Sequence, residues 1–263
     1  MASKYSNKLK GKRVLVIGGT SGIGFCVAEA CIEFGAIVTV ASSRQEKIDK
    51  TIKRLTTSYP DAKARILGHT VDLATSDVEG ALQTLFEFAA MEGKLDHIVH
   101  TAGDGSGPMK ITEITPEDIQ KYGKVRYVSA LMMAKVAPQY MHQTSQSSIT
   151  ITGGVSSTKP APGWTTIAGW GAAKEGMARG LAVDLKPIRV NLVSPGAIDT
   201  EIFDNYSGGD PARRKQLIEL YRSKNLLGKC GSPEDTAEAY LYMMRDTFVT
   251  GHVLHTDGGY LLI

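Results

Sequence analysis

The first residues whose types and spacing could do chemistry form a glycine-rich turn near the N-terminus. An apolar, β-branched run at 13–17 leads into this turn, and a helical stretch follows it. Glycines let the backbone approach a pyrophosphate closely, and a helix N-terminus offers free N–H groups and a favourable dipole. We therefore expect dinucleotide binding at Gly18, Gly19, Thr20, Ser21, Gly22, Ile23 and Gly24.

A second polar group, Ser42, Ser43 and Arg44, follows the next predicted strand. An NAD-binding domain usually places an acidic residue here, against the ribose hydroxyls. An arginine beside two serines can instead hold a 2′-phosphate. The sequence therefore favours NADP(H) over NAD, with an ordinary surface charge as the alternative for Arg44.

A parallel sheet would bring these residues together, and the sequence pattern predicts such a sheet. Short β-branched runs alternate with amphipathic helical stretches, which is typical of βαβ units. We expect a single α/β domain over 1–263, a Rossmann-type doubly wound parallel sheet. The expected strands are 13–17, 36–41, 64–71, 97–100, 148–152, 189–193 and 252–254. The expected helices start near Ser21 and cover 45–58, 76–92, 116–143 and 167–186.

The composition narrows the function classes. With 30 basic and 27 acidic residues scattered along the chain, nothing indicates a nucleic-acid partner. Three cysteines and six histidines show no metal-binding spacing, so we expect no metal site. No signal peptide or membrane span is evident, which predicts a cytoplasmic protein without a membrane partner.

The segment 199–229 differs from the rest of the chain. It is polar and is broken by Gly208-Gly209-Asp210-Pro211. We expect a mobile substrate lid here, with a surface insertion of no special role as the alternative.

Further motifs, in a fixed order, resemble the short-chain dehydrogenase/reductase family over almost the whole chain. The resemblance implies a seven-stranded parallel sheet and a homotetramer. It also implies contacts to the adenine from Asp72 and Leu73, and to the nicotinamide region from Pro195, Gly196, Ile198 and Thr200. The motifs are Val71-Asp72-Leu73, Thr101-Ala102-Gly103, Arg189-Val190-Asn191, Ser194 to Thr200, Gly231 to Asp235 and Thr256-Asp257-Gly258-Gly259.

The family's catalytic tetrad of asparagine, serine, tyrosine and lysine is kept here only at the lysine, Lys174. The tyrosine position, four residues earlier on the same helix face, is Trp170. Gly154 takes the serine position, although Ser156 or Ser157 could replace it, and the asparagine position is Arg126. Tryptophan does not ionise, and general-acid help is worth roughly 10²–10⁴ in rate. Ordinary ketone reduction should therefore be badly impaired.

An iminium ion needs no such acid, because its carbon is already electrophilic. A site for a delocalised cation needs aromatic walls and a few orienting charges. Trp164 and Trp170, the only two tryptophans, together with Arg126 and Asp104, are the candidates. Core packing for the tryptophans and an interface salt bridge for Arg126 are the alternatives.

The loop 159–164, with Gly154, Arg126, Trp170 and Lys174, resembles a fungal branch of the family from the malbrancheamide and paraherquamide pathways. This resemblance implies an NADPH-dependent reductase and Diels–Alderase. It implies a prenylated indole substrate with a zwitterionic pyrazinone ring, closed by [4+2] addition to a bicyclo[2.2.2]diazaoctane. The branch carries aspartate at the position of Ala161, so this chain is expected to be a weakened active-site variant, unless the alanine is natural.

Two other functions stay open from the sequence. One is a catalytically silent NADP-binding protein of the same fold. The other is a carbonyl reductase with a displaced proton donor such as Tyr127 or Tyr206. Tyr127 follows Arg126 on a helix and should point about 100° away from it, which makes it a poor donor.

Overall fold

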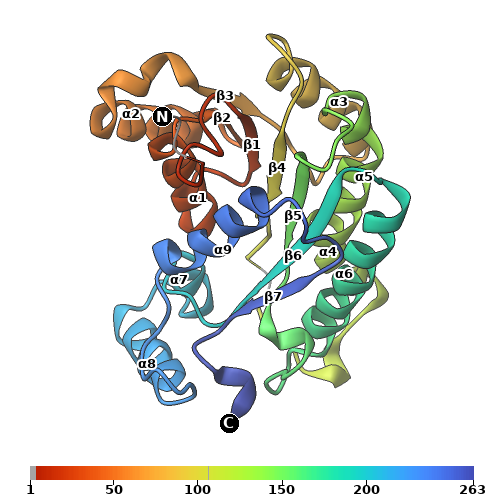
Figure 1. Cartoon of the computed structure of the whole chain (residues 1–263). Coiled ribbons are helices and arrows are strands. Elements are labelled where there is room, and N and C mark those ends of the chain that lie inside the picture. Colours follow the sequence, from red (N-terminus) through yellow and green to blue (C-terminus); the bar gives the residue numbers. More distant parts are fainter. Residues whose placement is uncertain (1–3, 106) are drawn as a thin grey trace.

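Seven parallel strands form one sheet in the computed structural model, which describes residues 4–105 and 107–263 (Figure 1). The strand order is β3-β2-β1-β4-β5-β6-β7, so the chain reverses its direction of growth between β1 and β4. Loops diverge at such a switch point and leave a crevice at the carboxyl ends of the strands. The strands are β1 (Arg13–Ile17), β2 (Ile37–Ser42), β3 (Ile66–Thr70), β4 (His97–His100), β5 (Ser148–Thr152), β6 (Arg189–Pro195) and β7 (Val253–Thr256).

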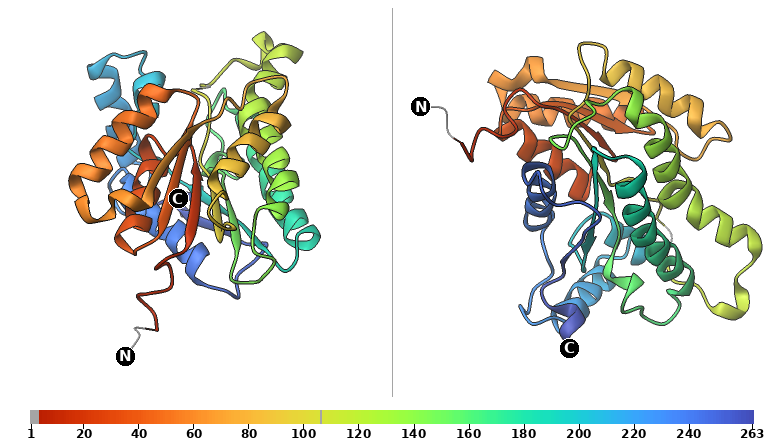
Figure 2. Two further views of the ribbon diagram at one scale, coloured as in Figure 1. Left: turned by 90° about the horizontal axis from the view of Figure 1, so that it is seen from above. Right: turned by 45° about the vertical axis from the view of Figure 1, so that its right-hand side comes forward.

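Helices cover both faces of the sheet, as the views in Figures 1 and 2 show. One apolar core joins the sheet to α1, α2 and α9, and the other joins it to α3, α5 and α6. Because both faces are covered, the inner strands are nearly continuous buried runs instead of alternating ones, whereas the edge strands β3 and β7 are only partly buried. The helices are α1 (Gly22–Glu33), α2 (Gln45–Ser58), α3 (Val78–Ala89), α4 (Pro116–Gly123), α5 (Ser129–Val136), α6 (Thr165–Asp184), α7 (Ile202–Tyr206), α8 (Pro211–Arg222) and α9 (Pro233–Arg245).

The predicted fold class is confirmed, with shifts of one to three residues at element ends. The largest difference concerns the single helix expected over 116–143. The structure divides this stretch into α4, a π-helical turn at Lys124–Val128, α5 and a 3-10 turn at Ala137–Gln139. Pro138 accounts for the early end because it lacks an N–H donor. We refer to Lys124–Val128 as the π turn; Arg126 lies within it.

The segment expected to form a lid folds as two helices, α7 and α8, separated by Gly208 and Gly209. Both glycines have positive φ, which supports the predicted break in this segment. The mobility of the segment remains a prediction.

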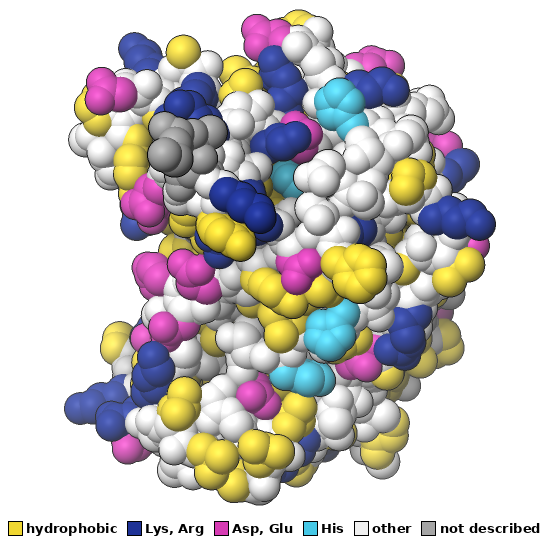
Figure 3. Space-filling view, viewed as in Figure 1, with side chains coloured by type: hydrophobic (Ala, Val, Ile, Leu, Met, Phe, Trp, Pro, Cys, Tyr) yellow, Lys and Arg dark blue, Asp and Glu magenta, His cyan; other side chains and the backbone are white. Residues whose placement is uncertain are grey.

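Acidic and basic side chains are interspersed on the face of the molecule shown in Figure 3. Within residues 4–105 and 107–263, no helix is long and apolar enough to cross a membrane.

Candidate active site

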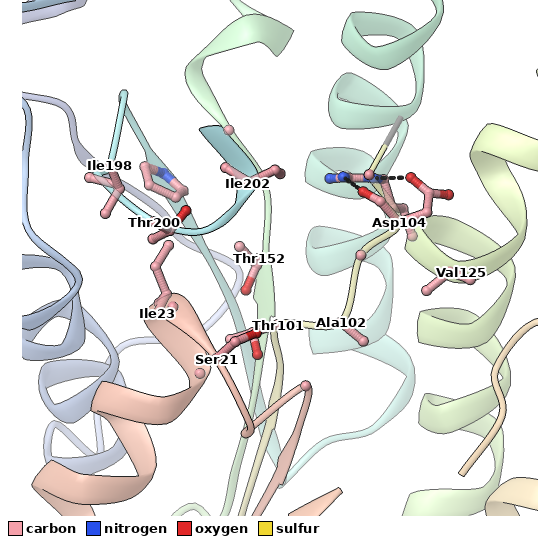
Figure 4. A pocket seen from close by; sticks show the side chains of 18 of the residues that line it. Ser21, Ile23, Thr101, Ala102, Asp104, Val125, Thr152, Ile198, Thr200 and Ile202 are labelled. Atoms are coloured by element: carbon pink, nitrogen blue, oxygen red, sulfur yellow. Dashed lines mark hydrogen bonds and ion pairs between the residues drawn. The ribbon is translucent and has the colours of Figure 1, made fainter. Parts of the chain in front are cut away.

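One cleft of about 740 Å³ opens at the carboxyl ends of the strands, at the β1/β4 switch point (Figure 4). Most of the site residues predicted from the sequence line this cleft, from Gly18 in the glycine-rich turn to Lys174 and Thr200, whereas Gly19 of the same turn does not. The loops after the strands supply much of the lining, and residues of α1, α2, α6, α7, α8 and the π turn complete it.

The glycine-rich turn forms the floor of the cleft and has no room for side chains. A Cβ on Gly24 would lie 2.3 Å from the carbonyl oxygen of Gly18, and one on Gly18 would lie 2.6 Å from the backbone nitrogen of Ala102. Ser21, the N-cap of α1, makes no side-chain capping bond. The helix start is thus available to an anion, and the turn fits a pyrophosphate.

Basic residues gather at the end of the cleft beside β2. Arg44 and Lys47 line it with Ser42 and Ser43, an arrangement suited to a phosphate group. Lys47 was missed in the sequence, although its place three residues after Arg44, in the first turn of α2, was a usable signal. Asp72 holds its own loop, accepting a hydrogen bond from the backbone N–H of Ala74 at 2.8 Å.

Lys174 lies buried at the centre of the cleft, with 5% of its surface exposed. Its Nζ donates a hydrogen bond to the carbonyl oxygen of Thr152, at the end of β5. Burial, and then the charge of Arg126, lower the pKa of Lys174 to about 7, while Asp104 raises it.

Arg126 and Asp104, predicted as separate pocket charges, form one ion pair. The Nε of Arg126 donates to the Asp104 carboxylate at 3.0 Å, and Nη2 donates to the Asp104 carbonyl oxygen; the dashed lines at Asp104 in Figure 4 mark this pair. The guanidinium lies over Gly103, where a Cβ would approach its Cζ to 3.1 Å. This pair presents a fixed dipole to the cleft, because Asp104 compensates the charge of Arg126.

The two tryptophans line the cleft in different ways. Trp164 packs edge-on against Tyr206 of α7, with ring centroids 5.6 Å apart. Trp170 leans towards α4, where its Nε1–H donates to the Ile119 carbonyl oxygen at 3.0 Å. Its ring also lies 4.8 Å from the ring of Tyr127.

The serine position of the tetrad is open. Around Gly154, the nearest atom to an added Cβ would be the Oγ of Ser156, at 3.8 Å. Ser156 lines the cleft, whereas Ser157 donates to Glu175 at 2.5 Å or to the Gly154 carbonyl oxygen at 2.9 Å. Of the two alternative serines, the structure therefore favours Ser156. Ala161 brings a methyl group to the same cleft.

The segment 199–229 brings three aromatic residues to the cleft, and the sequence analysis named only one of them, Tyr206, as an alternative proton donor. Phe203 and Tyr221 line the cleft and stack with ring centroids 5.7 Å apart. Tyr206 also lines it, and burial raises the pKa of its hydroxyl while Arg126 lowers it. Three aromatic residues in an otherwise polar segment were a signal that could have placed this segment over the site.

The other predicted donor, Tyr127, packs on Trp170 and is not among the residues that line the cleft within the described chain. The same described residues contain no group of three or more His, Cys, Asp or Glu side chains that could hold a metal ion.

Comparison with known proteins agrees with this geometry. The short-chain dehydrogenase/reductase malC from Malbranchea aurantiaca is 41% identical over 257 residues, covering 97% of this chain and 96% of its own. The short-chain dehydrogenase/reductase ucsE from an Acremonium species is 39% identical over 266 residues, covering both chains fully, at 100%.

Solved structures give the same result. The structure of the MalC reductase/Diels-Alderase from Malbranchea aurantiaca has a TM-score of 0.92, with 41% identity, over 98% of this chain and 99% of that one. A short-chain dehydrogenase from Burkholderia cenocepacia in complex with NADP has a TM-score of 0.82, with 27% identity, over 97% and 100%.

A small-chain dehydrogenase in complex with NADPH has a TM-score of 0.76, with 28% identity, over 97% of this chain and 100% of that one. These complexes support nicotinamide cofactor binding by this fold. The family described as the SDR-like Rossmann domain matches residues 5–263. The chain therefore belongs to the short-chain dehydrogenase/reductase family.

Proposed function

We propose that this protein is an NADPH-dependent reductase of a cationic C=N group. The observation that carries the proposal is the combination of a kept Lys174 with Trp170 at the tyrosine position. Lys174 lies buried at the centre of the cleft, whereas the indole N–H of Trp170 is bound to Ile119 and has no ionisable proton. The cofactor side of the site is thus complete, and the family's proton donor is missing.

If the group that accepts the hydride is already a cation, this site can catalyse the reduction without a proton donor. Reduced nicotinamide supplies a hydride, and addition to C=N⁺ gives a neutral amine without a proton from the protein. The chain's own task is to bind, orient and exclude water. Trp164 and Tyr206 offer aromatic surfaces against a delocalised cation, and the Arg126–Asp104 pair offers donors and an acceptor for polar groups of the substrate.

The proposed substrate is a prenylated indole carrying a zwitterionic, dipeptide-derived pyrazinone ring. Likeness to the MalC reductase/Diels-Alderase, at 41% identity over almost the whole chain, supports this substrate class. Reduction of the iminium group would leave an unstable azadiene in the ring, and the same cleft would hold this azadiene and the tethered prenyl alkene together for an intramolecular [4+2] addition. Oriented binding of two tethered groups can lower such a barrier by several kcal/mol.

For the cofactor we propose NADP(H) instead of NAD. Arg44 and Lys47 would hold the 2′-phosphate, the glycine-rich turn would hold the pyrophosphate, and Lys174 would hold the nicotinamide ribose. The presence of all these residues in the lining of one cleft supports this assignment.

We propose that alanine at position 161 lowers the catalytic activity of the site. It lines the cleft with a methyl group, which can neither pair with a cation nor move a proton. An aspartate at this position is expected to increase bridged product at least about tenfold, within the range of proton-transfer catalysis.

The test is incubation of the protein and of its Ala161→Asp variant with NADPH and the prenylated indole–pyrazinone, with products separated on a chiral column. A single bridged enantiomer, increased by the aspartate, is the expected result. NADPH binding with only racemic or no bridged product in both samples would contradict the proposal and favour a silent NADP-binding protein.

A second candidate, carbonyl reduction, is favoured by the position of Tyr206. This tyrosine lines the cleft near Arg126, and the raised pKa of its hydroxyl keeps it protonated at neutral pH. Turnover of a ketone that is lost in a Tyr206→Phe variant would support this candidate over iminium reduction.

A further inference from the structure

The indole of Trp170 contacts the helix that carries Arg126. Its Nε1–H donates to the Ile119 carbonyl oxygen in α4, and its ring fills the space beside Gly123, the last residue of α4. An added Cβ on Gly123 would lie 2.6 Å from the indole Cζ2. The π turn that contains Arg126 begins at the next residue, Lys124.

A π turn closes its backbone hydrogen bonds over five residues instead of four, so the regular α-helical ladder is interrupted at its ends. Its closing bond runs from the Ser129 N–H to the Lys124 carbonyl oxygen, five residues apart. Side chains supply donors on both flanks. Trp170 binds Ile119 before the turn, and Ser129 Oγ donates to the Val125 carbonyl oxygen at 2.6 Å within it.

Ser129 is itself held in place by a residue of the sheet, His100. Its hydroxyl has one hydrogen, which is used on Val125, so it accepts from the Nε2–H of His100 at 3.0 Å. His100 is buried at the end of β4, where burial lowers its pKa to about 3 and keeps it neutral. The π turn is therefore fixed at one end by β4 and at the other by α6.

We propose that Trp170 is a positioning residue: its indole holds the π turn in the geometry that places Arg126 over Gly103 and against Asp104. The residue that replaces the family's tyrosine thus acts through Arg126, and it does not contact the reacting atoms. Only the kinetic part of the test below depends on the proposed function.

The direct test is hydrogen–deuterium exchange of the amides of Val125–Ser129 in a Trp170→Phe variant, which removes the indole N–H. Loss of this exposed hydrogen bond is expected to speed this exchange at least about threefold, without a similar change in the sheet. Tyr127→Phe keeps both rings in contact and is the matched control, with no change expected. Unchanged exchange in a folded Trp170→Phe protein would overturn the proposal.

A Gly123→Ala variant tests the contact between α4 and the Trp170 indole from the α4 side. It replaces the first test if the Trp170→Phe variant does not fold. Alanine favours helices by itself, but its Cβ would clash with the indole, so the same faster exchange is expected. Gly180→Ala on α6, whose Cβ would meet no atom within 4 Å, is its control. Slower exchange of the π turn in Gly123→Ala would contradict the inferred contact.

A double-mutant cycle with Arg126→Ala separates positioning from direct substrate contact. With Arg126 present, Trp170→Phe should lower kcat/KM for the indole–pyrazinone about tenfold, mainly through KM, with the Kd for NADPH within about twofold. In the Arg126→Ala background the further loss should be under about twofold. If the losses in kcat/KM of the two single variants multiply in the double variant, the proposal is overturned, because Trp170 would then act on the substrate itself.

The two proposals fail in distinguishable ways. If the unaltered protein does not turn over this substrate, the proposed function is wrong, and the exchange measurements still decide the role of Trp170.

Discussion

Arg44 is the residue on which the choice between the two nicotinamide dinucleotides depends. Its guanidinium lines the cleft beside Ser42 and Ser43, where only NADP(H) would offer a phosphate. An Arg44→Ser variant should raise the Kd for NADPH about 10- to 100-fold, as expected for loss of one or two charge-assisted hydrogen bonds. The Kd for NADH should stay nearly constant.

Titration of NADPH and NADH by fluorescence checks this expectation. Lys63→Ala, an exposed residue outside the lining of the cleft, is the control for a general loss of positive charge. An equal loss for both dinucleotides would show that Arg44 does not recognise the 2′-phosphate.

Two buried histidines predict that the protein loses stability in mild acid. Burial lowers the pKa of both His97 and His100 from 6.5 to about 3. Below pH 6.5 the unfolded chain takes up protons that the folded chain refuses, so the stabilising effect is complete above pH 6.5 and is lost as the pH falls. At pH 5.5 each histidine should lower the free energy of unfolding by about 1.4 kcal/mol.

Urea unfolding at about pH 7.5 and 5.5 measures this loss. In a His100→Asn variant the loss between the two pH values should be smaller by about 1.4 kcal/mol, whatever the variant's stability at the higher pH. An identical loss in the variant and the unaltered protein would contradict the assignment to His100.

At the residue scale, sequence reasoning predicted which candidate residues lie in one cleft but not the hydrogen bonds and ion pairs between them. Motif spacing placed Gly18 and Arg44 at the carboxyl ends of strands and Lys174 on a helix, and all of them line one cleft. The Arg126–Asp104 pair and the bond from Trp170 to Ile119 depend on side-chain directions set by tertiary packing. No local sequence pattern encodes those directions.

One arginine links α7 and α8, the two helices of the segment 199–229, to the loop after β6. Arg214 of α8 contacts Asp199, just after β6, at 2.6 Å and Asp204 of α7 at 2.8 Å. Isolated surface ion pairs contribute little, but one guanidinium that joins two carboxylates links three segments at once. Removing it in Arg214→Ala should raise KM for the substrate about fivefold, with little change in the Kd for NADPH.

Steady-state kinetics, with limited proteolysis near Gly208 and Gly209, tests the role of this link. The neighbouring Arg213→Ala is the matched control, because Arg213 reaches only Asp210, at 3.5 Å, and is largely exposed. If KM and the cleavage rate are the same in both variants, the lid does not depend on Arg214.

At the element scale, the alternation of strands and helices was predictable, because the spacing of apolar residues within each segment indicates whether that segment is a strand or a helix. The π turn was not predictable from the stretch 116–143. Its residues, Lys124–Val128, include no glycine or proline that would mark an irregular helix, and the side chains that support it come from α5, α6 and β4. The π turn is thus a property of the packed molecule.

For the whole molecule, family membership predicts a homotetramer. Phe248 is 97% exposed and Leu262 is 78% exposed in the single chain, which leaves apolar surface available for subunit contact. Light scattering after size exclusion should give a mass of about four times 28.3 kDa. A Leu262→Glu variant should shift the mass towards smaller species, and a monomeric mass for the unaltered protein would contradict the prediction.

The central claim is that this cleft reduces a cationic C=N group without a tyrosine acid. The most direct test supplies NADPH deuterated at the transferable C4 position, with the prenylated indole–pyrazinone in one sample and a ketone analogue in the other. We predict deuterium at the former C=N carbon of a single bridged enantiomer, and ketone turnover at least about 100-fold slower. Comparable ketone turnover, or bridged product without deuterium, would contradict the claim.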